Sequence, residues 1–207
     1  MEGDSPRSKS VARAYAEAVA LALVMAVAIR SCVVQAFKIP SGSMLPTLQI
    51  GDHLLISKLH YGLRVPLVGG WLVMSHQPRP GDVIVFEYPV DRSQDFIKRV
   101  IAVEGEIVEI RDKQVLVDRR PRDAAEAFFA DGIETVQPRS PRDNYGPVRV
   151  PPRHVFVMGD NRDRSYDSRF WGFVNFDDIE GKALFLYWSW DGRDRWVRWE
   201  RIGDEIQ

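Results

Sequence analysis

The sequence has little cysteine, no excess of charge of either sign and no internal repeat. Its single cysteine, Cys32, excludes an internal disulfide and a zinc cluster built from several thiolates. The 28 Lys and Arg residues are balanced by 29 Asp and Glu residues, so the net charge is −1 and a nucleic-acid partner is disfavoured. With 45% hydrophobic residues, the 207-residue chain can bury a core, which argues against wholesale disorder and against several membrane spans.

One long apolar run lies near the N-terminus. Residues 18–29 read AVALALVMAVAI, and extension past Arg30 to Phe37 gives a helix of about 30 Å, close to the thickness of a bilayer's hydrocarbon core. The stem of Arg30 can lie along apolar surface while its guanidinium reaches the headgroups. A membrane anchor is the favoured interpretation, with a signal peptide cleaved near residues 26–28 and a buried soluble helix as alternatives.

Basic residues in front of this run indicate its orientation. Arg7, Lys9 and Arg13 precede it, and positive charge is retained on the cytoplasmic side of a membrane. The sequence therefore predicts three parts: a cytoplasmic N-terminus at 1–17, a transmembrane anchor at 18–37 and an extracytoplasmic domain at 38–207.

After residue 40 the pattern changes from helical to β. Short β-branched or aromatic runs alternate with Gly, Pro and Asp turn signals, at residues 53–57, 82–88, 96–103, 106–110, 114–117, 155–158 and 183–190. Because no long amphipathic helix intervenes, we predict a mainly β fold with antiparallel sheets. Residues 119–152 are rich in Pro, Arg and Asp, so a small inserted lobe is expected at about 105–152.

Two serines lie in a turn-like segment just beyond the expected anchor. Residues 40–47 read PSGSMLPT, in which glycine allows close backbone approach to a reacting carbonyl and the prolines restrict the turn. Such a turn can present a nucleophile, although the same residues are ordinary in structural turns. The segment contains neither a G-x-S-x-G elbow nor an S-x-x-K pairing.

Metal ligands are not indicated by the sequence. The four histidines lack a spacing such as H-E-x-x-H: they are His53, His60, His76 and His154. Residues 159–169 alternate Asp and Asn in the manner of a calcium loop, but the glycine and glutamate positions of an EF-hand are not met. The interleaved arginines instead indicate internal Asp–Arg pairs, so we expect no metal and no cofactor.

Lys98 is the candidate base for a serine nucleophile. It lies in the β-like run 96–101, where burial of its ammonium would lower the pKa and leave a usable fraction of neutral amine. On the residues alone, solvated charges on a strand are the favoured interpretation of Lys98 and Arg99.

Four collinear segments resemble the conserved boxes of bacterial type I signal peptidases, which are membrane-anchored serine proteases that remove signal peptides from exported proteins. Residues 37–44, with 46–48 and 51–52, are similar to the nucleophile box, residues 80–86 to the next box, residues 96–100 to the lysine box and residues 159–172 to the last box. The resemblance covers most of the chain after about residue 30.

The resemblance implies a Ser–Lys dyad without histidine. Ser43 would be the nucleophile and Lys98 the general base. The oxyanion would be held by the backbone N–H of Ser43 and the hydroxyl of Ser41. Two departures from the family pattern leave these residues untouched: residues 102–106 read AVEGE in place of the usual GLPGD, and Arg164 replaces an Asn.

The resemblance also implies supporting residues. Ser165 would orient the lysine amine, Asp167 and Arg169 would form an ion pair that shapes the site, and Asp160 would be structural. Small substrate residues at −1 and −3, as in Ala-x-Ala, would enter shallow pockets. We expect the pocket walls to include Ile39, Ile84 and Val85.

The implied partners are the signal peptides of exported preproteins and the lipid bilayer, with a functional link to the protein-export machinery. The implied location is the bacterial cytoplasmic membrane, with a single pass. Four tryptophans fit either a membrane interface or the packing of a terminal hairpin: Trp188, Trp190, Trp196 and Trp199.

Two rival functions are considered. A self-cleaving SOS-response repressor uses a similar dyad but carries a helix-turn-helix domain where this chain has an apolar helix. An anchored β-domain that acts as a scaffold is the non-enzymatic alternative.

Overall fold

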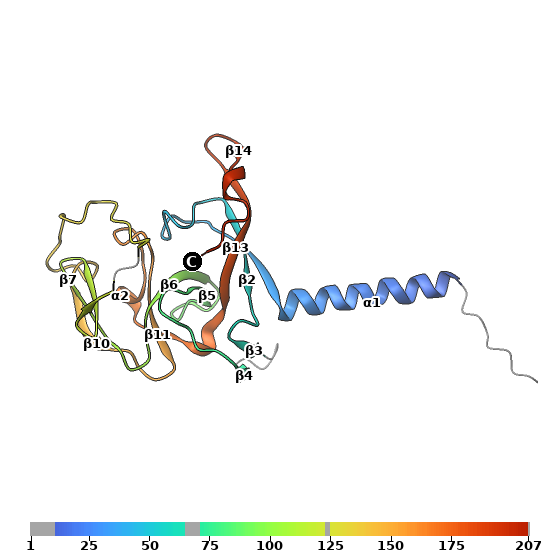
Figure 1. Cartoon of the computed structure of the whole chain (residues 1–207), viewed down its shortest axis with the longest axis horizontal. Coiled ribbons are helices and arrows are strands. Elements are labelled where there is room, and N and C mark those ends of the chain that lie inside the picture. The colour runs from blue at the N-terminus through green and yellow to red at the C-terminus, as the bar shows by residue number, and fades with distance from the viewer. Residues whose placement is uncertain (1–10, 65–70, 123–124, 207) are drawn as a thin grey trace, which may run out of the picture.

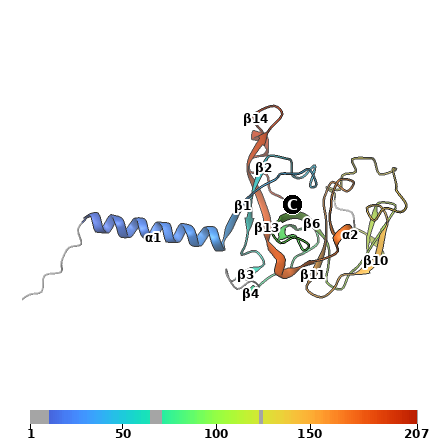
Figure 2. The ribbon, with the colours of Figure 1, turned by 180° about the vertical axis from the view of Figure 1, so that it is seen from behind.

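The chain folds into a β body from which one long helix projects (Figure 1). The computed structural model describes residues 11–64, 71–122 and 125–206. Helix α1 (Val11–Cys32) leaves one end of the body, and a second lobe lies at the opposite end, as the reverse view confirms (Figure 2). The predicted mainly β, antiparallel architecture is confirmed.

The large sheet forms the centre of the body. Its strands follow in the order β1 (Val34–Lys38), β2 (Asp52–Ser57), β13 (Ile179–Asp191), β5 (Val83–Glu87), β6 (Asp95–Val103), β11 (His154–Met158) and β12 (Val174–Asn175), and β14 (Trp196–Val197) pairs with β13. Neighbouring strands pair antiparallel throughout. The sheet therefore brings together segments from both halves of the chain.

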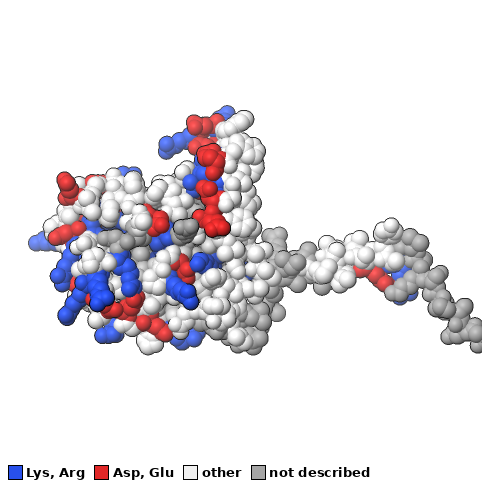
Figure 3. Space-filling view, viewed as in Figure 1, with Lys and Arg blue, Asp and Glu red and all other residues white. Residues whose placement is uncertain are grey.

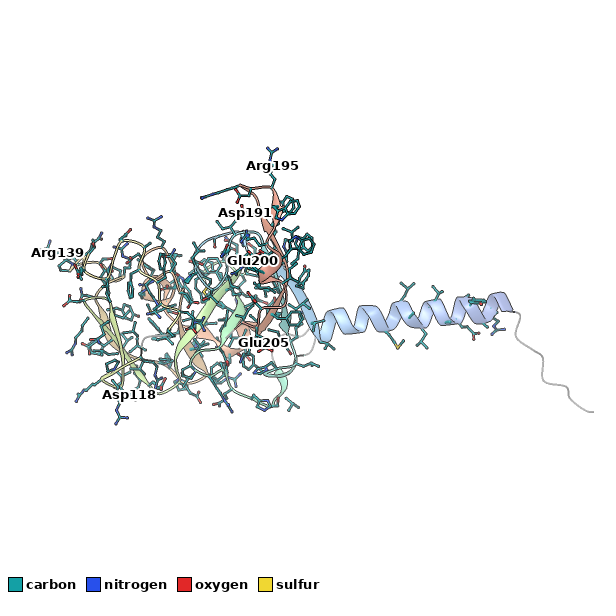
Figure 4. The ribbon with its side chains drawn as sticks, turned by 45° about the horizontal axis from the view of Figure 1, so that its top comes forward. Asp118, Arg139, Asp191, Arg195, Glu200 and Glu205 are labelled. Carbon is teal, nitrogen blue, oxygen red and sulfur yellow. The ribbon has the colours of Figure 1, made fainter. Side chains whose placement is uncertain are left out.

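Smaller elements complete the fold. The second lobe is a four-stranded sheet in the order β10 (Tyr145–Arg149), β7 (Ile107–Arg111), β8 (Gln114–Val117) and β9 (Arg120–Pro121), and β3 (Gly62–Arg64) pairs with β4 (Trp71–Met74). The short helices are α2 (Ser168–Trp171) and two 3₁₀ turns, η1 (Phe176–Asp178) and η2 (Trp199–Arg201). Asp118 and Arg139 extend outward from the far side of the second lobe (Figure 4).

The described part of the N-terminal helix runs from Val11 to Cys32, whereas an anchor over residues 18–37 was expected. Residues from Val34 onward form β1 instead, because this segment pairs with β2 and Phe37 packs against the core. Within the described ranges, no helix has the combined length and hydropathy that a bilayer span requires.

At strand β5, the large sheet is buried on both faces. Val83 and Val85 join one hydrophobic cluster, whereas Ile84 and Phe86 join another. Successive side chains of a strand point to opposite faces, so a strand whose residues are all buried must be covered on both sides. The sheet is thus a rigid support for groups at its edges.

The C-terminal hairpin of β13 and β14 carries exposed aromatic side chains. Trp190 and Trp196 are 41% and 66% exposed, and Trp188 packs edge-to-face on Trp199 while both stay partly exposed. Figure 4 places Arg195 at the tip of this hairpin and Asp191 below it. All four tryptophans therefore stay at least partly exposed, and none is enclosed in the core.

Candidate active site

The loop between β1 and β2 carries Ser43. Met44 and Leu48 on this loop are fully buried in the core, and the amide of Leu48 donates to the carbonyl of Met44 over 2.9 Å. At the ends of the loop, Ile39 and Gly51 are linked by a 3.0 Å backbone hydrogen bond. The two buried side chains and the hydrogen bond that joins the ends of the loop hold Ser43 in one position.

Lys98 reaches Ser43 from strand β6. Its Nζ lies 2.9 Å from Ser43 Oγ and donates to the carbonyl oxygen of Ile97 over 2.8 Å. Lys98 is 4% exposed. Burial lowers the pKa of Lys98 to about 8, against the opposing influence of the Asp167 and Asp160 carboxylates. A substantial fraction of neutral amine therefore faces a hydroxyl at neutral to alkaline pH.

Arg99, next to Lys98 on β6, makes a buried ion pair with Asp160. The guanidinium donates two hydrogen bonds of 2.7 Å to the carboxylate, and the side chains are 2% and 1% exposed. The same carboxylate accepts a 2.6 Å hydrogen bond from Thr47 Oγ1. Asp160 thus joins β6, the Ser43 loop and the loop after β11.

Asp167 and Arg169 form a second buried pair beside Lys98. Two hydrogen bonds of 2.8 Å join them, and Asp167 also accepts from the amide of Gly159. Burial favours the neutral acid, but the guanidinium of Arg169 outweighs it and keeps the pKa of Asp167 below the ordinary value. Asp167 therefore stays ionised close to the amine.

Asn161 holds the backbone of Gly42 and Ser43. Its amide N–H donates to the carbonyl of Ser43 over 3.1 Å, and its Nδ2 donates to the carbonyl of Gly42 over 3.1 Å. Asn161 lies in residues 159–172, the segment similar to the last box, and no role was predicted for it. Its position after a buried strand, beside Asp160, was the available signal.

Ser165 is buried close to both loops, and its expected role in orienting the Lys98 amine stays a prediction. Its hydroxyl helps to lower the pKa of the Asp167 carboxyl, while the hydrogen bonds of Lys98 Nζ go to Ser43 and Ile97. A methyl group at Gly159 would lie 2.3 Å from Ser165 Oγ and 2.4 Å from the Ser43 carbonyl oxygen. Ser165, Gly159 and Ser43 are therefore packed against one another.

Gly159→Ala is expected to lower kcat at least about 10-fold, because the new methyl group has to displace the backbone of the nucleophile. Steady-state kinetics on a model substrate checks this. Gly192→Ala in the terminal hairpin is the matched control, since no atom lies within 4 Å of its methyl group. Equal rates for the two variants would contradict the close packing.

A cleft of about 440 Å³ opens over the Ser43–Lys98 pair. It is lined by Pro40, Ser41, Gly42, Ser43, Gln94, Asp95, Phe96, Ile97, Lys98, Arg164 and Tyr166. Ser41 is thus on the same wall as Ser43. Within the described residues, no three His, Cys, Asp or Glu side chains are arranged to hold a metal ion.

The residues predicted for the pocket walls are absent from this cleft. Ile39, Ile84 and Val85 are at most 2% exposed and belong to the hydrophobic core. Since both faces of β5 are covered, its apolar side chains are enclosed by other strands and loops. Phe96 and Ile97 supply the apolar part of the lining instead.

The chain is similar to known signal peptidases. The model of the family described as signal peptidase, peptidase S26, matches residues 12–188. Signal peptidase I of Pseudomonas fluorescens is 34% identical over 81% of this chain and 69% of its own length. Signal peptidase I of Leptolyngbya laminosa is 35% identical, with 90% and 82% covered, and probable signal peptidase I-1 of Synechocystis is 38% identical, with 88% and 83% covered.

Proposed function

Because the chain belongs to the signal peptidase family, peptidase S26, and is therefore a peptide-bond hydrolase, we propose that it removes signal peptides with Ser43 as nucleophile and Lys98 as general base. The observation that carries this proposal is the 2.9 Å hydrogen bond between Lys98 Nζ and Ser43 Oγ at the floor of an open cleft. The substrates are exported preproteins.

Proton transfer follows from the position of the amine. Neutral Lys98 accepts the proton of Ser43 Oγ as that oxygen attacks the scissile carbonyl carbon. The proton then passes to the leaving amine, and the signal peptide stays on Ser43 as an ester. Lys98 next takes a proton from water, whose oxygen attacks the ester and regenerates the Ser43 hydroxyl.

Stabilisation of the oxyanion is assigned to two groups on the cleft wall. The backbone N–H of Ser43 and the hydroxyl of Ser41 are the donors, and both belong to residues that line the cleft. Asn161 supports this role, because its two hydrogen bonds fix the carbonyl groups on either side of the Ser43 amide. Donors that are already in place cost no reorganisation when charge develops.

The rate of cleavage is expected to rise with pH, with a midpoint near 8. The pKa of Lys98 is lowered to about 8, and only the neutral amine accepts a proton. As the pH falls through that value, Lys98 becomes protonated and kcat/KM decreases about 10-fold per pH unit. A profile of kcat/KM from pH 5 to 10 checks this, and a flat acidic limb would exclude Lys98 as the base.

The substrate rule is tested by mapping the cut. The detergent-solubilised full chain is incubated with a preprotein that has Ala at −1 and −3, and mass spectrometry identifies the new N-terminus. One cut after the −1 alanine, lost when that alanine is replaced by leucine, is expected, because a bulky side chain has to displace packed walls. No cut by a folded protein would favour the scaffold function.

Anchoring in the cytoplasmic membrane is part of the proposal, with the catalytic domain outside, where preproteins leave the export machinery. Its support is α1, on which Val19, Leu21 and Leu23 are about 60% exposed. The end of the body beside α1 carries few charges on the face seen in Figure 3, whereas charged residues gather over the second lobe. Exposed apolar side chains such as those on α1 gain free energy in lipid.

A further inference from the structure

The turn between β7 and β8 holds a buried lysine. Asp112 and Lys113 both have positive φ, 48° and 70°, in a two-residue hairpin turn of the kind that favours Asn-Gly. Lys113 is nevertheless 3% exposed, although lysines on turns are usually solvated. An unfavourable backbone conformation and a buried ammonium at one residue indicate a role beyond closing the hairpin.

Lys113 is one of the contacts between the second lobe and the loop that follows β11, beside the backbone hydrogen bonds of Phe128 with Asp160 and Arg162. Its Nζ lies 2.8 Å from Asp163 Oδ1 and donates to the carbonyl of Gly132 over 2.8 Å. The Lys113 and Asp163 side chains are each 1% exposed. The other oxygen of Asp163 accepts from the amide of Asp131. The carboxylate is thus held by two segments of the second lobe.

Arg142, also in the second lobe, contacts both ends of the same loop. Its guanidinium donates to the carbonyl of Asp163 over 3.1 Å. Its own carbonyl accepts a 2.9 Å hydrogen bond from the guanidinium of Arg169. The amide of Lys113 donates to the carbonyl of Asp143, so the hairpin turn and the Arg142 segment are themselves joined. Residues 163–169 are therefore clamped at their start and at their end.

The clamped loop faces the catalytic amine. It carries Ser165 and the Asp167–Arg169 pair, and the charged groups that act on Lys98 are Asp160, Asp167 and Arg169. Ser165 and Asp167 lie between the two contact points of the clamp, and Arg169 is itself the second contact point. A small displacement of the loop would change both the enclosure of Lys98 and its distance from a carboxylate.

We propose that Lys113 and Arg142 are positioning residues that fix the loop of residues 163–169 against the Ser43–Lys98 pair. The inference rests on the proposed function of that pair and assigns the second lobe a part in proton transfer. Lys113 acts through Asp163, and Arg142 acts through Asp163 and Arg169. Neither residue lines the cleft, so neither is expected to bind substrate.

The test compares Lys113→Met with Arg111→Gln in the full chain. Arg111 lies two residues away in an exposed pair with Glu109 and serves as the matched control. Lys113→Met is expected to lower kcat at least about 10-fold with KM within about 2-fold, because the reacting groups are displaced while the cleft remains. The midpoint of its pH profile is expected to move upward, since a loosened loop admits water and weakens the burial of Lys98.

Further variants distinguish a positioning role of Lys113 from a general loss of protein stability. Lys113→Arg is expected to restore most of kcat, because it keeps a cation that can reach Asp163. If Lys113→Met does not fold, Arg142→Gln tests the inference instead. It is expected to show the same lowered kcat and the same upward shift of the pH midpoint. A folded variant with the wild-type kcat and pH midpoint would overturn the inference. Cleavage by Ser43→Ala would instead overturn the proposed function, so the two failures are distinguishable.

Discussion

Lys98→Met is expected to lower kcat at least about 1,000-fold while leaving the melting temperature unchanged or higher. The loss follows because methionine cannot accept the proton of Ser43, which Lys98 contacts over 2.9 Å. Removing both members of a pair that acts as a unit costs little more than removing one, so Lys98→Met combined with Ser43→Ala should be no less active than either variant alone.

The stability part of this prediction follows from the lowered pKa. Lys98 titrates near 8 in the folded protein and near its ordinary value of 10.5 when unfolded, so between these values the unfolded chain binds more protons. The free energy of unfolding therefore rises with pH across that window. Below pH 8 the buried ammonium costs on the order of 3 kcal/mol, which methionine removes.

Lys182→Met on strand β13 is the matched control. Lys182 belongs to the same large sheet but pairs with Asp82, and it does not line the cleft of Ser43. This variant should keep full activity and lose a little stability. Thermal unfolding and initial rates at pH 8 measure both properties. A Lys98→Met protein that is folded and cleaves at the wild-type rate would exclude the dyad.

Asp160→Ala is expected to lower the free energy of unfolding by about 3–5 kcal/mol. The carboxylate makes two 2.7 Å hydrogen bonds to Arg99, and both side chains are almost fully buried. Removing it takes away the carboxylate that neutralises the buried Arg99 guanidinium and frees the hydroxyl of Thr47. The Ser43 loop also loses a tie to β6, so activity should fall as well.

Urea unfolding of Asp160→Ala beside Glu109→Ala measures this effect. Glu109 pairs with Arg111 at the surface of the second lobe, where an ion pair contributes at most about 1 kcal/mol. Both variants remove a carboxylate that pairs with an arginine, which is buried for Asp160 and exposed for Glu109. Equal midpoints would show that the Arg99–Asp160 pair contributes no more than an exposed one.

The Ser43–Lys98 pairing was predictable from family resemblance, not from the local pattern. The two residues are 55 positions apart, and the run around Lys98 on its own favours solvated charges on a strand. Only the arrangement of the sheet shows that Lys98 is next to Ser43 and not in solvent. Strand β6 lies between β5 and β11, and the Ser43 loop closes over its end. Periodicity gives the existence of these strands but not their neighbours.

The differences from the prediction have physical causes as well. The pocket role expected for Ile84 and Val85 stays a prediction, because β5 is covered on both faces and neither residue lines the cleft over Ser43. Phe37 was placed in a helix because hydropathy alone does not mark where a helix ends and a strand begins. The burial of Lys113 could not be predicted from the sequence, since burial of a charge depends on a partner distant in sequence.

Cleavage by Ser43→Ala tests the central claim most directly. The full-length variant and the wild-type chain, matched by circular dichroism and melting temperature, are incubated with the same preprotein, and the products are followed by mass spectrometry. We predict one cut after the −1 alanine by the wild-type chain and no product from Ser43→Ala over the same period. The same cut at the wild-type rate by folded Ser43→Ala would contradict the assignment of Ser43 as nucleophile.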